Sequence, residues 1–173
     1  MTQERKVRVA VLPELRLAYF ERRGTLESVQ AAWDELNAWR ADVRPALGRI
    51  DIAAIGWYLS ETEGDTEVAI LRAGVPVRSD YRVEPPARVM LFPGREFVYA
   101  PASDGDEYGA AFAAAADYIE RERLAGEDDT LEAAEVHLYH FNLDQHPAEC
   151  GYLLPGEVRP QGGHASPLPI APR

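Results

Sequence analysis

The chain has 173 residues, which is long enough for one domain with a substantial hydrophobic core. Its formal net charge of −11 opposes binding to nucleic acids and anionic membranes. The charge either keeps the protein soluble or attracts cationic ligands and basic partners. The single cysteine, Cys150, excludes an internal disulfide framework, and no stretch is apolar enough to span a membrane, so we expect a cytoplasmic protein.

The first half of the chain reads as two strands, a helix and two more strands. Alternating or continuous apolar runs predict the strands, at residues 7–11, 15–19, 55–59 and 66–71. Thr25 follows the turn at Gly24 and is suited to cap the helix. The helix has one apolar face, on which we assign both tryptophans to the core: Leu26, Val29, Ala32, Trp33, Leu36 and Trp39.

The second half follows a linker at residues 78–88, which contains Pro85-Pro86. Its alanine-rich helix is expected at about 106–124, because alanine favours helix and allows close packing on a sheet. The expected strands lie near 88–92, 96–100, 136–143 and 151–154. Residues 156–173 are rich in proline and glycine and are expected to be mostly irregular.

A constant spacing relates the two halves. Pro13 and Pro93 are 80 residues apart, as are Tyr19 and Tyr99, while Tyr58 and Tyr139 are 81 apart. The spacing indicates an internal duplication, with pseudo-repeats at 7–76 and 88–155 within one domain of residues 1–155. We therefore predict an α+β fold in which both helices lie on one side of an antiparallel sheet, with a ligand groove between the halves.

The same residues resemble the GyrI-like small-molecule-binding family, the effector-binding domain of AraC-type and multidrug-sensing regulators. The resemblance covers about residues 7–155 and rests on four segments: Leu12-Pro13-Glu14-Leu15-Arg16-Leu17-Ala18-Tyr19 before Gly24, Ala31-Ala32-Trp33 in the helix, Ile55-Gly56-Trp57-Tyr58, and Phe92-Pro93-Gly94 with Tyr99. It implies a tandem of two βαββ repeats around a cavity that takes lipophilic, often cationic, aromatic molecules. Family members include regulators, stand-alone domains, inhibitors of DNA gyrase and hydrolases of cyclopropane-containing natural products.

The chain departs from the family pattern in three places. The first strand begins near Lys6 and leaves no room for a preceding helix-turn-helix, so we expect a stand-alone domain without direct DNA binding. The family often has a glutamate two residues before a tyrosine in the penultimate strand; with Tyr139 as that tyrosine, His137 stands in its place and Glu135 lies two residues earlier. The hairpin turn Glu61-Thr62-Glu63-Gly64-Asp65 replaces an Asp-Asp-Pro-like turn.

Aromatic residues are the first candidates for ligand binding, because flat lipophilic ligands stack on them and cations bind their faces. Ordinary core packing is the alternative for each of them. Neighbours in a strand point to opposite faces, so Trp57 and Tyr58 cannot easily line one cavity together. The aromatic candidates are Trp57, Tyr58, Tyr99, Tyr108 and Tyr139.

Glu135 and His137 lie on one strand face and complete the candidate set. A carboxylate beside an imidazole can bind a cation or act as a general base, and a solvated strand edge is the alternative. The histidines His137, His140 and His146 match no standard metal spacing, so no metal or cofactor is expected. No catalytic residue can be assigned, since no phosphate loop, nucleophile elbow or zinc-protease motif occurs.

Three functional hypotheses follow. The first is a stand-alone domain that binds small lipophilic molecules, cations included, for multidrug-type sensing or sequestration. The second is a hydrolase of electrophilic natural products that uses a cavity carboxylate and a tyrosine. The third is a protein inhibitor that binds a basic surface of a partner such as gyrase. The sequence names neither the ligand nor the oligomeric state.

Overall fold

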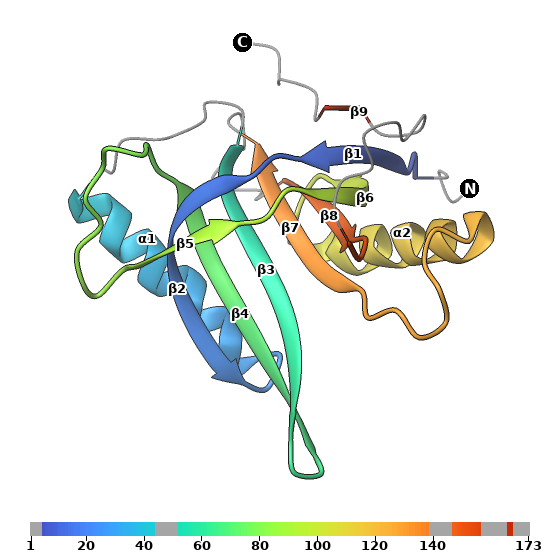
Figure 1. Ribbon diagram of the computed structural model, residues 1–173, viewed down its shortest axis with the longest axis horizontal. Helices are drawn as coiled ribbons and strands as arrows, with labels where there is room; N and C mark the ends of the chain where they lie inside the picture. The colour runs from blue at the N-terminus through green and yellow to red at the C-terminus, as the bar shows by residue number, and fades with distance from the viewer. Residues whose placement is uncertain (1–4, 44–51, 139–146, 157–165, 168–173) are drawn as a thin grey trace.

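One curved sheet with two helices on its outer side makes up the fold (Figure 1). The computed structural model describes residues 5–43, 52–138, 147–156 and 166–167. The first half contains β1 (Arg8–Leu12), β2 (Leu15–Gly24), the 3₁₀ turn η1 (Ser28–Gln30), α1 (Ala31–Val43), β3 (Ile52–Glu63) and β4 (Thr66–Pro76). The second half contains β5 (Arg88–Phe92), β6 (Arg95–Ala102), η2 (Gly105–Glu107), α2 (Tyr108–Glu122), β7 (Glu132–Leu138) and β8 (Ala148–Leu153), and a short β9 (Ser166–Pro167) follows.

The strand order is symmetric about the centre of the sheet. It runs β5-β2-β4-β3-β7-β8-β6-β1-β9, so β3 of the first half pairs with β7 of the second half in the middle. The first strand of each half joins the other half: β1 pairs with β6, and β5 pairs with β2. All pairs are antiparallel except β1 with β9. The predicted α+β fold of duplicated repeats is confirmed.

The register of the strands repeats the spacing seen in the sequence. Ile55 pairs with Val136, its counterpart 81 residues later, so this pair lies at the centre of the pseudo-symmetry. Tyr19 pairs with Gly74 on β4, and Tyr99 pairs with a glycine on β8 in the same way. The positions of Tyr19 and Tyr99 in the two halves are therefore equivalent, as the duplication predicts.

The two glycines opposite these tyrosines allow close approach between strands. At Gly151 of β8, an added Cβ would collide with the carbonyl oxygen of Val98 and lie 2.6 Å from the Cα of Tyr99. At Gly74 of β4, it would lie 3.0 Å from the carbonyl oxygen of Ala18. Both sites are filled by backbone atoms of the neighbouring strand, which cannot rotate away as a side chain can.

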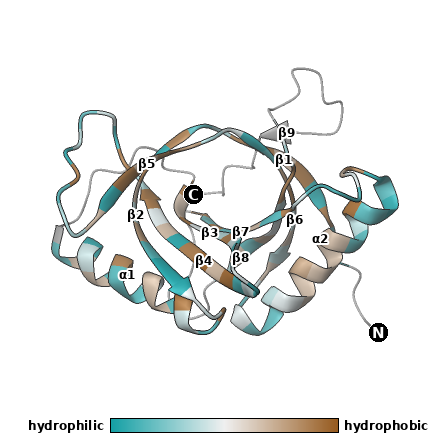
Figure 2. Ribbon diagram, turned by 60° about the horizontal axis from the view of Figure 1, so that its bottom comes forward, coloured by the Kyte–Doolittle hydropathy of each residue, from teal (hydrophilic) through white to brown (hydrophobic). Residues whose placement is uncertain are grey.

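The inner side of the curved sheet holds the main core. Each strand alternates its side chains between the two sides, and the inward ones from both halves meet in one cluster. Figure 2 shows the strands arching around this space, with both helices outside the arch. The aromatic members of this inner core are Trp57, Phe92, Phe97 and Tyr99.

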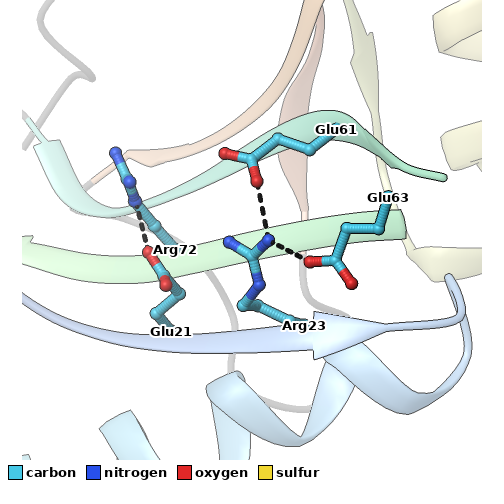
Figure 3. A network of polar contacts seen from close by, with 5 residues as sticks. All are labelled: Glu21, Arg23, Glu61, Glu63 and Arg72. Carbon is cyan, nitrogen blue, oxygen red and sulfur yellow. Dashed lines mark hydrogen bonds and ion pairs between the residues drawn. The ribbon is translucent and has the colours of Figure 1, made fainter. Parts of the chain in front are cut away.

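Charged residues continue the inner side beyond the apolar cluster (Figure 3). Arg72 of β4 bonds Glu21 at 2.7 Å, and its guanidinium lies 5.4 Å from the centre of the Trp57 ring. Arg23 of β2 lies between Glu61 and Glu63 of β3, at 2.6 and 2.8 Å. The latter pairs are exposed, so each contributes little to stability by itself.

The helices cover the flanks of the sheet and leave its centre open. α1 packs on β2 and β4, and α2 packs on β6 and β8. Ala111 and Ala115 of α2 are fully buried, which confirms that its alanines allow close packing on the sheet. The outer side of β3 and β7, between the helices, is left to form the floor of a cleft.

The start of the first helix differs from the prediction. Ordered α-helix begins at Ala31, after η1, and Leu26 is 65% exposed rather than part of a buried face. The Thr25 hydroxyl accepts the backbone N–H of Ser28 at 3.1 Å, so the predicted capping contact is present one turn earlier than the α-helix itself. No helix in the described residues has the length and apolarity needed to cross a membrane.

Candidate functional site

A cleft of about 1140 Å³ lies between α1 and α2 on the outer side of the sheet. Its floor comes from the two central strands, with Ala54 and Tyr58 on β3 and Glu135 and His137 on β7. The walls come from both helices and from β8, through Trp33, Asn37, Arg40, Tyr108, Phe112 and Tyr152. The pseudo-symmetry of the sheet thus places the cleft between the halves, because each helix covers only its own flank.

Glu135 is the polar centre of the cleft. It is 4% exposed, although its strand pattern left a solvated strand edge open as an alternative. Its Oε1 accepts two hydrogen bonds, from Trp33 Nε1 at 2.8 Å and from the Tyr58 hydroxyl at 2.8 Å. A buried carboxylate with two neutral donors and a cleft in front of it has room for a further, positively charged neighbour.

Trp33 reaches the cleft from α1. It is only partly buried, whereas Ala32 and Leu36 beside it are fully buried under the helix. Its ring meets the ring of His137 edge-on, with centroids 5.2 Å apart and an angle of 78° between planes. Trp33 therefore packs against the outer core only partly buried, and its indole N–H also binds the cleft carboxylate, while Trp39 is a buried member of the core as predicted.

A short chain of hydrogen bonds crosses the floor. The amide Nε2 of Gln30 lies 3.3 Å from the Tyr58 hydroxyl oxygen, and that hydroxyl donates to Glu135. Burial raises the pKa of Tyr58, and the negative charge of Glu135 raises it further. Tyr58 therefore stays a protonated donor at neutral pH and holds the carboxylate in place.

His137 lies two residues along β7 from Glu135, on the same face, as the sequence predicted. Its Nε2 is 3.7 Å from Glu135 Oε2, and the side chain is buried. Its partner on β3 is Ala54, whose small side chain leaves space in the cleft beside His137. The carboxylate and the imidazole thus face one cavity together.

The α2 side of the cleft is aromatic. Phe112 packs edge-on against Tyr152, with ring centroids 5.8 Å apart. Burial raises the pKa of Tyr108, with a smaller contribution from the charge of Glu135. This wall therefore presents uncharged aromatic surface opposite Trp33.

Gly56 makes space for the central contacts. It pairs with Glu135 across the β3–β7 ladder. An added Cβ would lie 2.6 Å from the Trp33 ring and 2.8 Å from Glu135 Cγ. This explains the glycine of the Ile-Gly-aromatic segment: a residue with a Cβ would keep the indole of Trp33 and the carboxylate of Glu135 apart over this strand.

The structure brings four of the seven candidate residues to the cleft: Tyr58, Tyr108, Glu135 and His137. Trp57 and Tyr99 lie in the inner core on the other side of the sheet. The opposite orientations of Trp57 and Tyr58 agree with the strand alternation. Tyr139 lies outside the described residues.

Sequence reasoning missed the helix residues of the cleft. Gln30 of η1 and Trp33, Asn37 and Arg40 of α1 follow one another at spacings of three and four, so they form one stripe beside the buried face of the helix. In the sequence, this stripe consists of one aromatic residue among polar ones. The apolar residues beside it also have helical spacing, so Trp33 was assigned to the core together with them.

Cys150 faces the same side of the sheet and pairs with Glu135 in the β7–β8 ladder. It is buried, and burial together with the nearby carboxylates raises the pKa of its thiol. The thiol is therefore a small apolar residue at neutral pH, as expected from the sequence. No metal-binding cluster of three or more ligands occurs in the part of the chain described, and His140 and His146 lie outside it.

The chain matches no protein-family model and no curated protein. Its structure is similar to that of SAV2435, which was solved bound to tetraphenylphosphonium. The TM-score is 0.60 at 11% sequence identity, over 87% of this chain and 94% of that chain. At this identity the likeness shows the fold, and it agrees with the two-repeat fold that the GyrI-like resemblance implies.

Proposed function

We propose that this chain is a GyrI-like domain that binds small lipophilic molecules, cations included, in the cleft between α1 and α2, and so senses or sequesters them. The observation that carries the proposal is the Glu135 carboxylate, buried at the floor of a cleft with aromatic walls. A buried negative charge favours a ligand that brings a positive charge to it.

The energetics of the cleft suit such a ligand. Apolar walls favour entry because water leaves both surfaces. Trp33, Tyr58 and Tyr108 offer ring faces or edges around the carboxylate, and a cation over an aromatic face gains about 0.5–2 kcal/mol. The volume of about 1140 Å³ is slightly larger than that of ordinary ligand pockets, about 300–1,000 Å³, so a bulky ligand fits.

The ligand of the structural neighbour supports the same class. SAV2435 was solved with tetraphenylphosphonium, a bulky aromatic cation without hydrogen-bond donors. Such a cation is recognised by aromatic surface and by a nearby negative charge, and the cleft of this chain supplies both. We extend the ligand class to this chain on the strength of those residues.

The test is calorimetric titration of tetraphenylphosphonium into the wild type and into Glu135→Gln. We expect the substitution to weaken binding about tenfold or more, because it removes the charge but keeps the shape. A matched control is Glu132→Gln: Glu132 lies on the same strand and accepts a tryptophan N–H, from Trp57 at 2.9 Å, but it points away from the cleft.

Two results would contradict the proposal. One is the absence of binding to the folded wild type. The other is equal weakening by Glu135→Gln and Glu132→Gln, which would mean that the loss follows from net charge alone. Triphenylphosphine oxide, a neutral analogue, separates the contribution of the ligand's charge from that of its aromatic surface. Its affinity should be insensitive to Glu135→Gln.

Hydrolysis is a second candidate because a tyrosine hydroxyl donates to the cleft carboxylate, Tyr58 to Glu135 at 2.8 Å. A carboxylate and a phenol at one site can act as general base and general acid. Analysis of the ligand after incubation with the protein distinguishes binding from hydrolysis. Binding returns it unchanged, whereas hydrolysis returns an opened product and stops in Glu135→Gln.

A further inference from the structure

A positive charge also lines the cleft. Arg40 of α1 is half-buried in the cleft wall, and burial alone lowers the pKa of its guanidinium. Among the described residues it has no hydrogen-bond or ion-pair partner. A guanidinium that gives up water without gaining an acceptor is costly, since each such group carries five N–H donors.

Other arginines that are partly buried in this fold have partners. Arg72 bonds Glu21 at 2.7 Å, and Arg95 donates to the carbonyl oxygen of Leu154 at 2.8 Å. Both point to the inner side of the sheet or its edge, away from the cleft. Arg40 is thus distinguished by two features together: it lines the cleft, and no protein group in the described chain accepts its donors.

Arg40 lies about two turns of α1 beyond Trp33, the residue that donates to Glu135. Trp33, Asn37 and Arg40 follow one stripe of α1, at positions i, i+4 and i+7. Trp33 donates to Glu135, and seven residues of helix span about 10 Å along the axis. The cleft therefore has a carboxylate at one end of this stripe, a guanidinium at the other, and largely apolar walls between them.

We propose that the cleft is built for an elongated aromatic zwitterion, with an ammonium group at Glu135 and a carboxylate at Arg40. The proposal rests on the function proposed above and specifies its ligand class. A zwitterion with this spacing gives the buried carboxylate and the half-buried guanidinium a partner at once. A simple cation pairs with Glu135 only, and it leaves Arg40 without an acceptor in the described residues.

The rest of the cleft fits this arrangement. Asn37 lies between the two charged residues and can donate to or accept from a polar group in the middle of the ligand. Asp34 is exposed at the rim, where solvent screens its charge. The aromatic wall of Tyr108 and Phe112 stands opposite and can stack on the ligand body.

The experiment uses a rigid biphenyl that carries an aminomethyl group at one end and a carboxylate at the other, together with its methyl ester. The acid is a zwitterion and the ester a simple cation of nearly the same shape. Both are titrated into the wild type, Arg40→Gln and the control Arg82→Gln, an exposed arginine on the loop between the halves. Urea unfolding verifies that each variant is folded.

We expect the wild type to bind the zwitterion more tightly than the ester. Arg40→Gln should weaken the zwitterion about tenfold, because one charge-assisted pair is lost. The same substitution should leave the ester unchanged or bind it more tightly, because a like charge is removed. Arg82→Gln should change neither affinity, although it alters the net charge equally.

Equal affinities for acid and ester, both insensitive to Arg40→Gln, would overturn the zwitterion proposal while the function stands, because the ester would still bind and still respond to Glu135→Gln. An equal loss for both ligands in Arg40→Gln would overturn it too, since Arg40 would then act on the helix and not on the ligand carboxylate. If neither biphenyl nor tetraphenylphosphonium binds, the proposed function itself fails.

Discussion

Glu149 on β8 is a carboxylate whose burial is not compensated by hydrogen bonds to both oxygens. One of its oxygens, Oε2, is buried without a hydrogen-bond partner in the described structure. Burial raises its pKa, and Arg8 opposes that effect only in part. The charged form is therefore disfavoured in the folded state, which makes Glu149 a source of pH-dependent instability.

We predict that Glu149→Gln stabilises the protein at neutral pH more than at acidic pH. A carboxyl whose folded pKa lies above its ordinary value of 4.5 contributes stability below that value, and the contribution is lost as pH rises through the folded pKa. Glutamine does not titrate, so the variant should gain on the order of 1 kcal/mol at about pH 7 and less at about pH 4.

Urea unfolding at the two pH values measures this difference. The control is Glu127→Gln, on the exposed acidic loop between α2 and β7, which should show little change at either pH. A gain of the same size at both pH values would contradict the prediction, because it would follow from shape rather than charge.

Single residues of the cleft show how far the sequence could be interpreted. Strand alternation placed Glu135 and His137 on one face and Trp57 and Tyr58 on opposite faces, and the structure confirms both. Alternation could not say which face meets the helices, because β7 reads Glu-Ala-Ala-Glu-Val-His-Leu without a clear polar side. That choice depends on where α1 and α2 pack.

At the scale of elements, β6 and β8 approach each other through their backbones at one glycine. Gly151 of β8 lies against β6 so tightly that an added Cβ would collide with the carbonyl oxygen of Val98. Gly109 in the first turn of α2 has no atom within 4 Å of the same added Cβ. One substitution can therefore be compared at two positions with opposite steric surroundings.

We predict that Gly151→Ala lowers the free energy of unfolding by about 3 kcal/mol or more, because the strands must separate to admit the methyl group. Gly109→Ala should leave it unchanged or raise it by up to about 1 kcal/mol, because alanine favours helix. Urea unfolding followed by circular dichroism gives both values. A loss under about 1 kcal/mol in Gly151→Ala would mean that β6 and β8 yield easily at this point.

Element prediction succeeded where the pattern was local. Gly24 and Thr25 correctly located the end of β2 and the first turn after it. The ordered helix starts later, at Ala31, because the preceding Ser28–Gln30 turn is 3₁₀ and its apolar spacing looks the same in sequence. Leu26 was misplaced for this reason, since the helical spacing was extended one turn too far.

At the scale of the whole molecule, the duplication was predictable and the exchange of strands was not. The spacing of 80 residues follows from pairs such as Tyr19 and Tyr99, which the ladders confirm. Nothing local indicates that β1 leaves its own half to pair with β6, while β5 pairs with β2. Such pairing depends on how the two halves bury their sheets together, which is a property of the assembled core.

The net charge of −11 also acts at this scale, because it gives the whole molecule a long-range negative field. A field in solvent guides the approach of a cation, and salt screens it. In the proposed function Glu135 contacts the ligand only after entry, and because its side chain is 4% exposed, salt screens this short-range contact less than the long-range field. The association and dissociation rate constants of the ligand should therefore depend on salt concentration differently.

We predict that raising the ionic strength from about 0.02 M to about 0.5 M lowers the association rate constant of tetraphenylphosphonium several-fold. The dissociation rate constant should change little, because the short-range contact is buried and poorly screened. Stopped-flow quenching of tryptophan fluorescence can follow both rates, since Trp33 lies in the cleft wall. Triphenylphosphine oxide should show no salt dependence in association, because it has no net charge. If salt instead speeds dissociation and leaves association unchanged, the attraction resides in the cleft alone and the charge of the whole molecule plays no part.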